Sequence, residues 1–209
     1  MAIKRSIIRN ALGLGLFAII TAGIIAVTQA VTAERIAEQT RKAEAAALFD
    51  IIPERQHDND LLSDTVTLPP SPLLGTGDIG HGWVARQNDQ PVGVILPVMA
   101  PDGYSGNIRL LVGIGHDTQV LGVRVTSHRE TPGLGDKIEL RKSSWVRTFD
   151  GRSLGDPAPE QWTVAKNGGA FDQFTGATIT PRAVVKAVKK ALIYFDNHQG
   201  TLLSDTSNQ

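Results

Sequence analysis

The 209-residue chain contains no cysteine. This absence excludes disulfide bonds, cysteine-ligated iron–sulfur clusters, thiolate zinc sites and cysteine nucleophiles from the chain. Any redox chemistry must therefore come from a bound organic cofactor or a haem. An excess of charge of one sign is also missing, because 21 basic residues balance 21 acidic residues. No charge bias favours nucleic acid as a partner.

Some catalytic patterns are absent as well. The sequence has no P-loop and no His-Glu-x-x-His zinc motif. Ser105 has a glycine two positions before it and one immediately after it, which is not the spacing of a nucleophile elbow. His57, His81, His116 and His198 fall in predicted loops, where solvated side chains are expected.

Residues 11–33 contain no charged side chain and are mostly Leu, Ile, Ala, Gly and Val. As a helix this run spans roughly 34 Å, enough to cross a bilayer core of about 30 Å. The alternative is a cleavable signal peptide, since Val31-Thr32-Ala33 resembles a small-residue cleavage site. Signal peptides have hydrophobic regions of roughly 7–15 residues, so the length favours a retained transmembrane helix.

The charges beside this run do not decide its orientation. Three basic residues precede it and three follow it: Lys4, Arg5, Arg9, Arg35, Arg41 and Lys42. The positive-inside count is therefore a tie.

The rest of the chain predicts an α+β domain with an antiparallel sheet and flanking helices. We expect a juxtamembrane helix, with a Glu38–Lys42 pair, that ends before Pro53, and an irregular connection over residues 56–80. Strands are predicted at residues 83–87, 92–99, 107–114, 120–126 and 162–166, and helices at residues 137–149 and from Thr180 onward. The predicted segments are residues 1–10, 11–33 (transmembrane), 34–55 (juxtamembrane helix and linker), 56–198 (domain) and 199–209 (loose tail).

Residues 172–178, Asp-Gln-Phe-Thr-Gly-Ala-Thr, precede the last predicted helix. Thr180 followed by Pro181 is a strong helix start, because Thr caps free amides and Pro at the first position gives up an N–H without a partner. Thr178 would then lie two residues before the cap, close to the positive end of the helix dipole. Such a place stabilises an anion such as a phosphate. The alternative is a turn that only leads into a capped helix.

Residues 128–135, His-Arg-Glu-Thr-Pro-Gly-Leu-Gly, form a second unusual segment. Pro132-Gly133 predicts a type II turn, and Gly135 adds a further flexible position. Such a loop can approach a planar ligand closely. It can also be only the connection between a strand and a helix.

Both segments resemble signatures of the FMN-binding subunits of the Rnf electron-transport complex and of the sodium-pumping quinone reductase. The first resembles the flavinylation motif Asp-x-x-(Ser/Thr)-Gly-Ala-(Thr/Ser), and the similarity extends to Gly103–Gly106 and over nearly the whole chain. The RnfG family of the Rnf complex matches the length better. The resemblance implies covalent FMN on the Thr178 oxygen through a phosphoester, with the rest of the motif supplied by Asp172, Thr175, Gly176 and Ala177.

The resemblance also implies that the 128–135 loop lies against the flavin. Polar contacts would come from His128, Glu130 and Thr131, and apolar walls from Leu134 and Phe174. Lys166, Asn167 and Gly169 are weaker candidates for the phosphate end. The resemblance implies no metal site.

The implied function is electron relay in a ferredoxin- and NAD-linked, ion-translocating complex of the bacterial inner membrane, or upkeep of a reduced redox regulator. Partners would be the other subunits, the membrane and a separate flavin transferase, with the domain on the periplasmic side. We expect no stand-alone turnover from this electron-carrier subunit. Two alternatives stay open: a membrane-tethered binding or assembly module without flavin, and a stand-alone flavoenzyme with His128 as its acid–base residue.

Overall fold

The computed structural model describes residues 2–204, apart from the side chains of residues 2–6, 8, 9, 34, 37, 38, 40, 41, 43 and 44. The expected Glu38–Lys42 pair therefore lies outside the described residues. The chain divides into two compact units, Met1–Ala43 and Glu44–Gln209, and each is described by itself.

The first unit is helical and belongs to α1, Ala2–Ile51. Its stretch Asn10–Ala33 has a mean hydropathy of 2.3 and is long and apolar enough to cross a membrane. Thr21, Thr28 and Thr32 each donate a hydroxyl hydrogen bond to the carbonyl four residues earlier. The hydroxyls in this apolar stretch are therefore satisfied within the helix, as a lipid environment requires. The predicted apolar N-terminal helix is confirmed.

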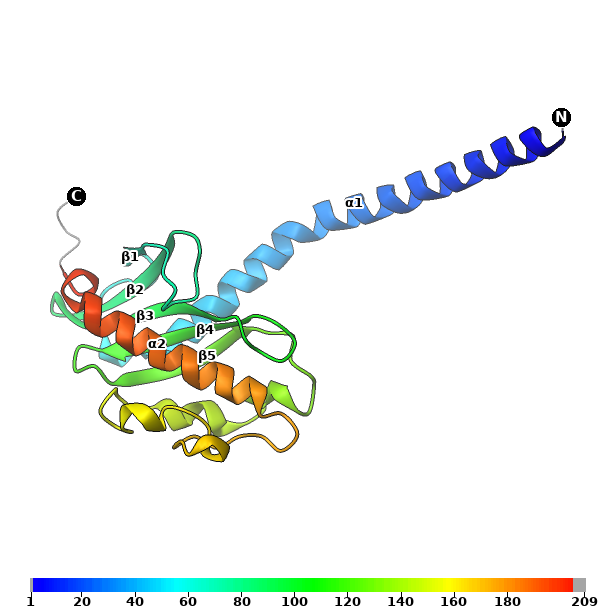
Figure 1. Cartoon of the computed structure of the whole chain (residues 1–209). Helices are drawn as coiled ribbons and strands as arrows, with labels where there is room; N and C mark the ends of the chain where they lie inside the picture. Colours follow the sequence, from blue (N-terminus) through cyan, green and yellow to red (C-terminus); the bar gives the residue numbers. More distant parts are fainter. Residues whose placement is uncertain (1, 205–209) are drawn as a thin grey trace. The chain divides into compact units, whose positions relative to one another are not determined.

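The second unit is built on a five-stranded antiparallel sheet in the order β1-β2-β3-β4-β5 (Figure 1). The strands are β1 Thr65–Leu68, β2 Gly80–Gln87, β3 Gln90–Ala100, β4 Ile108–Gly115 and β5 Val120–Ser127. The predicted four-stranded meander is confirmed, and β1 adds an edge strand inside the segment expected to be irregular. The β2–β3 turn uses Asn88 and Asp89, with φ of 52° and 60°. Two left-handed residues in a two-residue loop give a type I′ turn, which matches the twist of a hairpin.

The two faces of the sheet carry separate cores. Helix α2, Ile179–Leu202, covers one face and packs on β3 and β4 (Figure 1). Val94 and Leu96 of β3 belong to that core, whereas Ile95 between them points to the opposite core. This alternation is the period of two expected of a strand buried on both faces.

The end of α1 covers the opposite face. Leu48, Ile51 and Ile52 are at most 4% exposed and pack with Ile95 and Leu111. Their spacing places them on one side of the helix. Residues 48–52 therefore belong to the core of the domain, whereas we expected them in a juxtamembrane linker.

A layer of short helices and loops follows β5, and it corrects two predictions. The single helix expected at residues 137–149 is two 3-10 helices, Gly135–Ile138 and Ser144–Phe149, because Ser143 is extended and its hydroxyl caps Trp145. The strand expected at residues 162–166 is absent from the described fold. A lone bridge joins Val164 to Phe171, and a 3-10 helix, Ala165–Asn167, follows. Large side chains hold this layer: Trp145, Phe149, Trp162, Phe171 and Phe174 form ring contacts 4.8–6.3 Å apart.

Both ends of α2 differ from the prediction. The helix begins at Ile179, with Thr178 at the N-cap position, so Thr180 lies inside the helix and is not its cap. At the other end α2 continues to Leu202, because Leu202 is buried and His198 stacks on Tyr194 at 4.2 Å. The expected loose tail therefore loses residues 199–202 to the helix. Residues 205–209 lie outside the described part of the chain.

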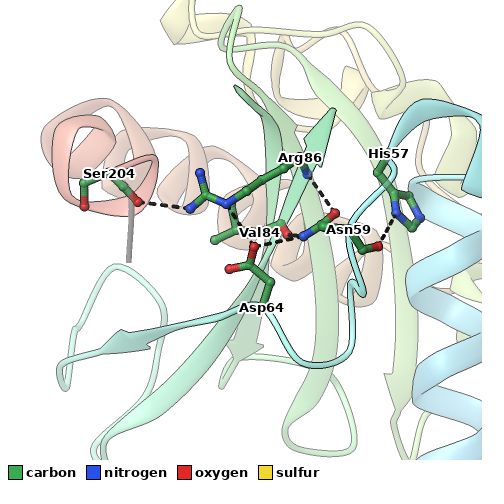
Figure 2. Close-up of polar contacts among 6 residues, drawn as sticks. All are labelled: His57, Asn59, Asp64, Val84, Arg86 and Ser204. Atoms are coloured by element: carbon green, nitrogen blue, oxygen red, sulfur yellow. Dashed lines mark hydrogen bonds and ion pairs between the residues drawn. The ribbon is translucent and has the colours of Figure 1, made fainter. Parts of the chain in front are cut away.

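A buried polar network holds the segment after α2 to the sheet, and we name Asn59, Asp64, Arg86 and Ser204 the Arg86 network. Figure 2 shows Arg86 between Asp64 and Ser204. Its Nε donates to Asp64 at 2.9 Å and its Nη2 to the Ser204 carbonyl at 3.1 Å. The Asn59 amide donates to Asp64 at 2.9 Å. The network joins the residues before β1, strand β2 and the end of α2.

Candidate functional site

Three segments that sequence analysis singled out meet at one buried carboxylate. Glu130 is 4% exposed. Its Oε1 accepts the Ser105 N–H at 2.9 Å, and its Oε2 accepts the Thr180 hydroxyl. A Cβ on Gly135 would lie 2.9 Å from the Glu130 Cβ and 3.0 Å from the Thr180 Oγ1, so glycine is needed at this close approach. We name Ser105, Glu130, Gly135 and Thr180 the Glu130 cluster.

His128 holds the start of the 128–135 loop. Its Nδ1 accepts the Glu130 N–H at 3.0 Å, so Nδ1 carries no proton. Nε2 therefore carries the proton and donates to Glu139 at 2.8 Å. A hydrogen bond from Arg141 lowers the pKa of the Glu139 carboxyl, and the bond from His128 lowers it further. Both ring nitrogens are thus engaged inside the protein, which favours a positioning role over acid–base chemistry.

The tip of this loop is the predicted turn. Gly133 has φ of +78°, and its N–H donates to Asp136 at 2.8 Å. The Thr131 carbonyl accepts the N–H groups of Leu134 and Gly135 at 3.1 and 3.0 Å. The side chains of Thr131 and Leu134 stay exposed at the tip. They are therefore available to a ligand.

Residues 172–178 form a tight turn before α2. Ala177 donates its N–H to the Phe174 carbonyl at 3.1 Å, and Gly176 has φ of +81° as the third residue of a type II turn requires. Trp145 donates its indole N–H to the Asp172 carbonyl at 2.8 Å. The Asp172 carboxylate and the Thr175 hydroxyl are on exposed residues.

Phe174 faces inward. It is 7% exposed and contacts the Trp145 ring at 5.1 Å. This burial favours a core role for Phe174 over the apolar wall suggested by the sequence.

The start of α2 leaves polar groups open beside Thr178. Thr178 has helical φ and ψ of −73° and −27°, and its side chain makes no capping hydrogen bond. Within residues 2–204, the N–H groups of Thr178, Ile179 and Thr180 have no acceptor, as is usual in a first helical turn. Pro181 has no N–H. A hydroxyl and free amides therefore lie together at the positive end of a helix of 24 residues.

Apolar side chains surround this place. The described residues of the domain include five large exposed hydrophobic ones: Leu62, Ile79, Tyr104, Leu134 and Ile179. Each of the last three adjoins a member of the Glu130 cluster in sequence. Leu134 also lies near Gly176, where a Cβ would be 3.6 Å from the Leu134 Cδ2. Sequence reasoning missed Tyr104 and Ile179, although their neighbours lay in its chosen segments.

The candidates at residues 166–169 lie on the neighbouring 3-10 helix and its end. The Lys166 N–H donates to the Gln173 side chain at 3.0 Å, which ties this segment to the turn at residues 172–178. Lys166 and Asn167 are exposed, whereas Gly169 is partly buried, and a Cβ there would meet the Thr163 backbone. Among the described residues, no hydrogen bond connects Lys166 or Asn167 with Thr178.

Two patterns that sequence reasoning overlooked have ordinary structural roles. Gly75–Gly80 fits Gly-x-Gly-x-x-Gly, but it leads from β1 into β2, whereas a dinucleotide site needs a strand followed by a helix. Residues 151–155 fit Gly-x-Ser-x-Gly, but Ser153 forms a lone bridge to Asp156 in a loop, away from any strand–helix elbow. Neither pattern supports a catalytic site. The described residues also contain no group of metal-ligating side chains.

Comparisons with known proteins place the chain in a family. Residues 103–193 match the family described as FMN-binding domain, and residues 1–51 match the family described as RnfG N-terminal region. Three similar proteins share one name, which makes each of them the G component of an ion-translocating oxidoreductase complex. The Pseudomonas aeruginosa protein is 53% identical over 203 residues, which cover 97% of this chain and 95% of that protein.

The other two are nearly as similar. The Shewanella oneidensis protein is 49% identical over 201 residues, or 96% of this chain and 95% of that protein. The Vibrio cholerae protein is 48% identical over 194 residues, or 93% of this chain and 92% of that protein. The chain therefore belongs to the RnfG family, the G components of the ion-translocating oxidoreductase complex.

Proposed function

We propose that this chain is a membrane-anchored flavoprotein subunit that carries FMN covalently on Thr178 and relays electrons within an ion-translocating oxidoreductase complex. The observation that carries the proposal is the uncapped start of α2, where the Thr178 hydroxyl lies beside free backbone amides. The matches to the FMN-binding family and to the G components of the complex support the same function.

The residues at this place fit an esterified flavin phosphate. A phosphodiester keeps one negative charge, which free N–H groups and the helix dipole stabilise. Gly176 has only the Leu134 side chain near the position of a Cβ, so the approach to Thr178 stays uncrowded. Tyr104, Leu134 and Ile179 supply exposed apolar surface for a planar ring.

Attachment requires a separate flavin transferase and an activated donor. The Thr178 oxygen forms a new bond to the phosphorus of the FMN half of a flavin dinucleotide. The pyrophosphate bond of that donor breaks, a nucleoside monophosphate leaves, and the hydroxyl proton passes to the transferase. This chain supplies the nucleophilic oxygen and the amides that receive the charged phosphate.

A bound flavin accepts and releases electrons, and the protein sets its position and potential. His128 and Glu139 orient the loop, while Thr131 and Leu134 face outward at its tip. In this function the chain passes electrons between other subunits, as the names of its relatives indicate. The complex either links ferredoxin and NAD to ion movement or keeps a redox regulator reduced. Helix α1 anchors the protein in the inner membrane, with the domain on the periplasmic side.

The experiment that tests this function expresses the full chain together with its transferase and records ultraviolet fluorescence of the denatured band. Wild type and Thr178→Ser should fluoresce, because both keep a hydroxyl at residue 178. Thr178→Val should lose the fluorescence without unfolding, whereas Thr175→Val, the matched control in the same turn, should keep it. A dark wild-type band would contradict the proposal and favour a binding or assembly module without flavin.

A further inference from the structure

We propose that Glu130 is a positioning residue that decides where α2 begins and so keeps the amides beside Thr178 open. Its buried carboxylate engages the Thr180 hydroxyl, which otherwise would cap the helix two residues farther along. The inference rests on the proposed function, because the open amides matter only if a phosphate is held there.

Two helix starts compete in this sequence. Thr180-Pro181 favours a helix with Thr180 as its N-cap and Pro181 as its first residue. The structure has the other start: α2 begins at Ile179, and the Arg182 N–H donates to the Thr178 carbonyl at 3.4 Å. Local preference alone does not explain this choice.

Glu130 supplies the missing cause. The Thr180 residue is fully buried, and its hydroxyl donates to the Glu130 Oε2. A hydroxyl held by a buried carboxylate is directed toward Glu130 instead of toward the first-turn amides. Thr180 can therefore take a helical conformation, and Thr178 becomes the N-cap residue.

The same carboxylate fixes the surroundings of that start. The Ser105 N–H donates to the Glu130 Oε1 at 2.9 Å, and Gly135 approaches both Glu130 and Thr180. Tyr104, Leu134 and Ile179 adjoin these contacts. One side chain thus sets the position of the nucleophilic hydroxyl together with three apolar neighbours. Its burial favours this role over a direct contact with the ring.

The test uses the full chain in detergent and three variants. Glu130→Met keeps a similar volume and releases Thr180, so the first-turn amides become capped and attachment should slow. A tenfold slower rate of covalent flavin incorporation is expected, about the effect of losing one hydrogen bond to a charged group. Glu130→Met with Thr180→Val removes the competing cap as well, so attachment should recover part of the loss.

Arg86→Met is the matched control, because it removes a buried charge from the Arg86 network. That network holds Ser204, beyond the far end of α2 from Thr178. This variant should lose stability but incorporate flavin normally per folded molecule. Equal slowing in Arg86→Met and Glu130→Met, or no recovery in the double variant, would overturn the inference.

Hydrogen exchange on chains made without the transferase separates this inference from the proposed function. In Glu130→Met the Arg182 amide should exchange faster than in wild type, because its acceptor at Thr178 is lost when the start moves. An unchanged Arg182 rate would overturn the role of Glu130. Faster exchange with no flavin on wild type would support that role and contradict the proposed function alone.

Discussion

Gly135→Ala tests the close packing of the Glu130 cluster. The added methyl carbon would lie 2.9 Å from the Glu130 Cβ, 3.0 Å from the Thr180 Oγ1 and 3.1 Å from the Glu130 Oε2. The first distance is shorter than real Cβ contacts, and none of the three atoms belongs to the free end of an exposed side chain. Glu130 and Thr180 must therefore separate, which strains the hydrogen bond between them.

The expected cost follows from overpacking of a filled site, about 1–3 kcal/mol of unfolding free energy. For a chain of this size each kcal/mol lowers the melting temperature by roughly 2–4 °C. Melting of the purified chain in detergent, followed by the fluorescence of the buried Trp145 and Trp162, should show the shift. The rate of flavin incorporation should fall as well.

Gly155→Ala provides the control. A Cβ there meets no atom within 4 Å, and Gly155 has no positive φ. Its unfolding free energy should stay within about 0.5 kcal/mol of wild type. If both variants melted together, the tight approach at Gly135 would be refuted.

Three further predictions concern the rest of the molecule. Leu48→Ala should destabilise the domain by about 2–5 kcal/mol because it empties a buried site under the sheet; the exposed Ile79→Ala is its control, and equal urea midpoints would contradict the packing of α1 on the sheet. Glu139 has a lowered pKa, so its carboxylate stabilises the fold above its ordinary value of 4.5 and loses this effect as the pH falls through the lowered pKa. Glu139→Gln should therefore show a smaller acid-induced loss of stability than wild type in urea titrations, and identical profiles would speak against the Arg141 and His128 contacts. Protease added to spheroplasts should digest the domain, whereas digestion only after lysis would contradict the periplasmic orientation.

Much of the fold follows from local patterns in the sequence. The alternation in β3 and β4, the Asn88-Asp89 turn and the uncharged run of α1 each predict their element without knowledge of the rest. Strand β1 escaped prediction because it has four residues and lies among prolines, so only its pairing with β2 defines it. The expected helix over residues 137–149 is interrupted because Ser143 caps its own short helix.

The site was predictable as segments but not as an arrangement. The sequence identifies residues 128–135 and 172–178, yet Glu130 contacts Thr180 across 50 positions of the chain. Such a contact depends on how β5 and α2 meet, and no local pattern encodes it. For the same reason the rule for helix starts selects Thr180, because it does not include a buried carboxylate that competes for the hydroxyl.

The most direct test of the central claim is peptide mass spectrometry of the chain purified from its native membrane complex. Trypsin releases residues 167–182, a peptide that contains Thr175, Thr178 and Thr180. Fragmentation of this peptide should place the mass of an FMN phosphoester on Thr178, with Thr175 and Thr180 unmodified. An unmodified peptide, or flavin on Thr175, would contradict the account.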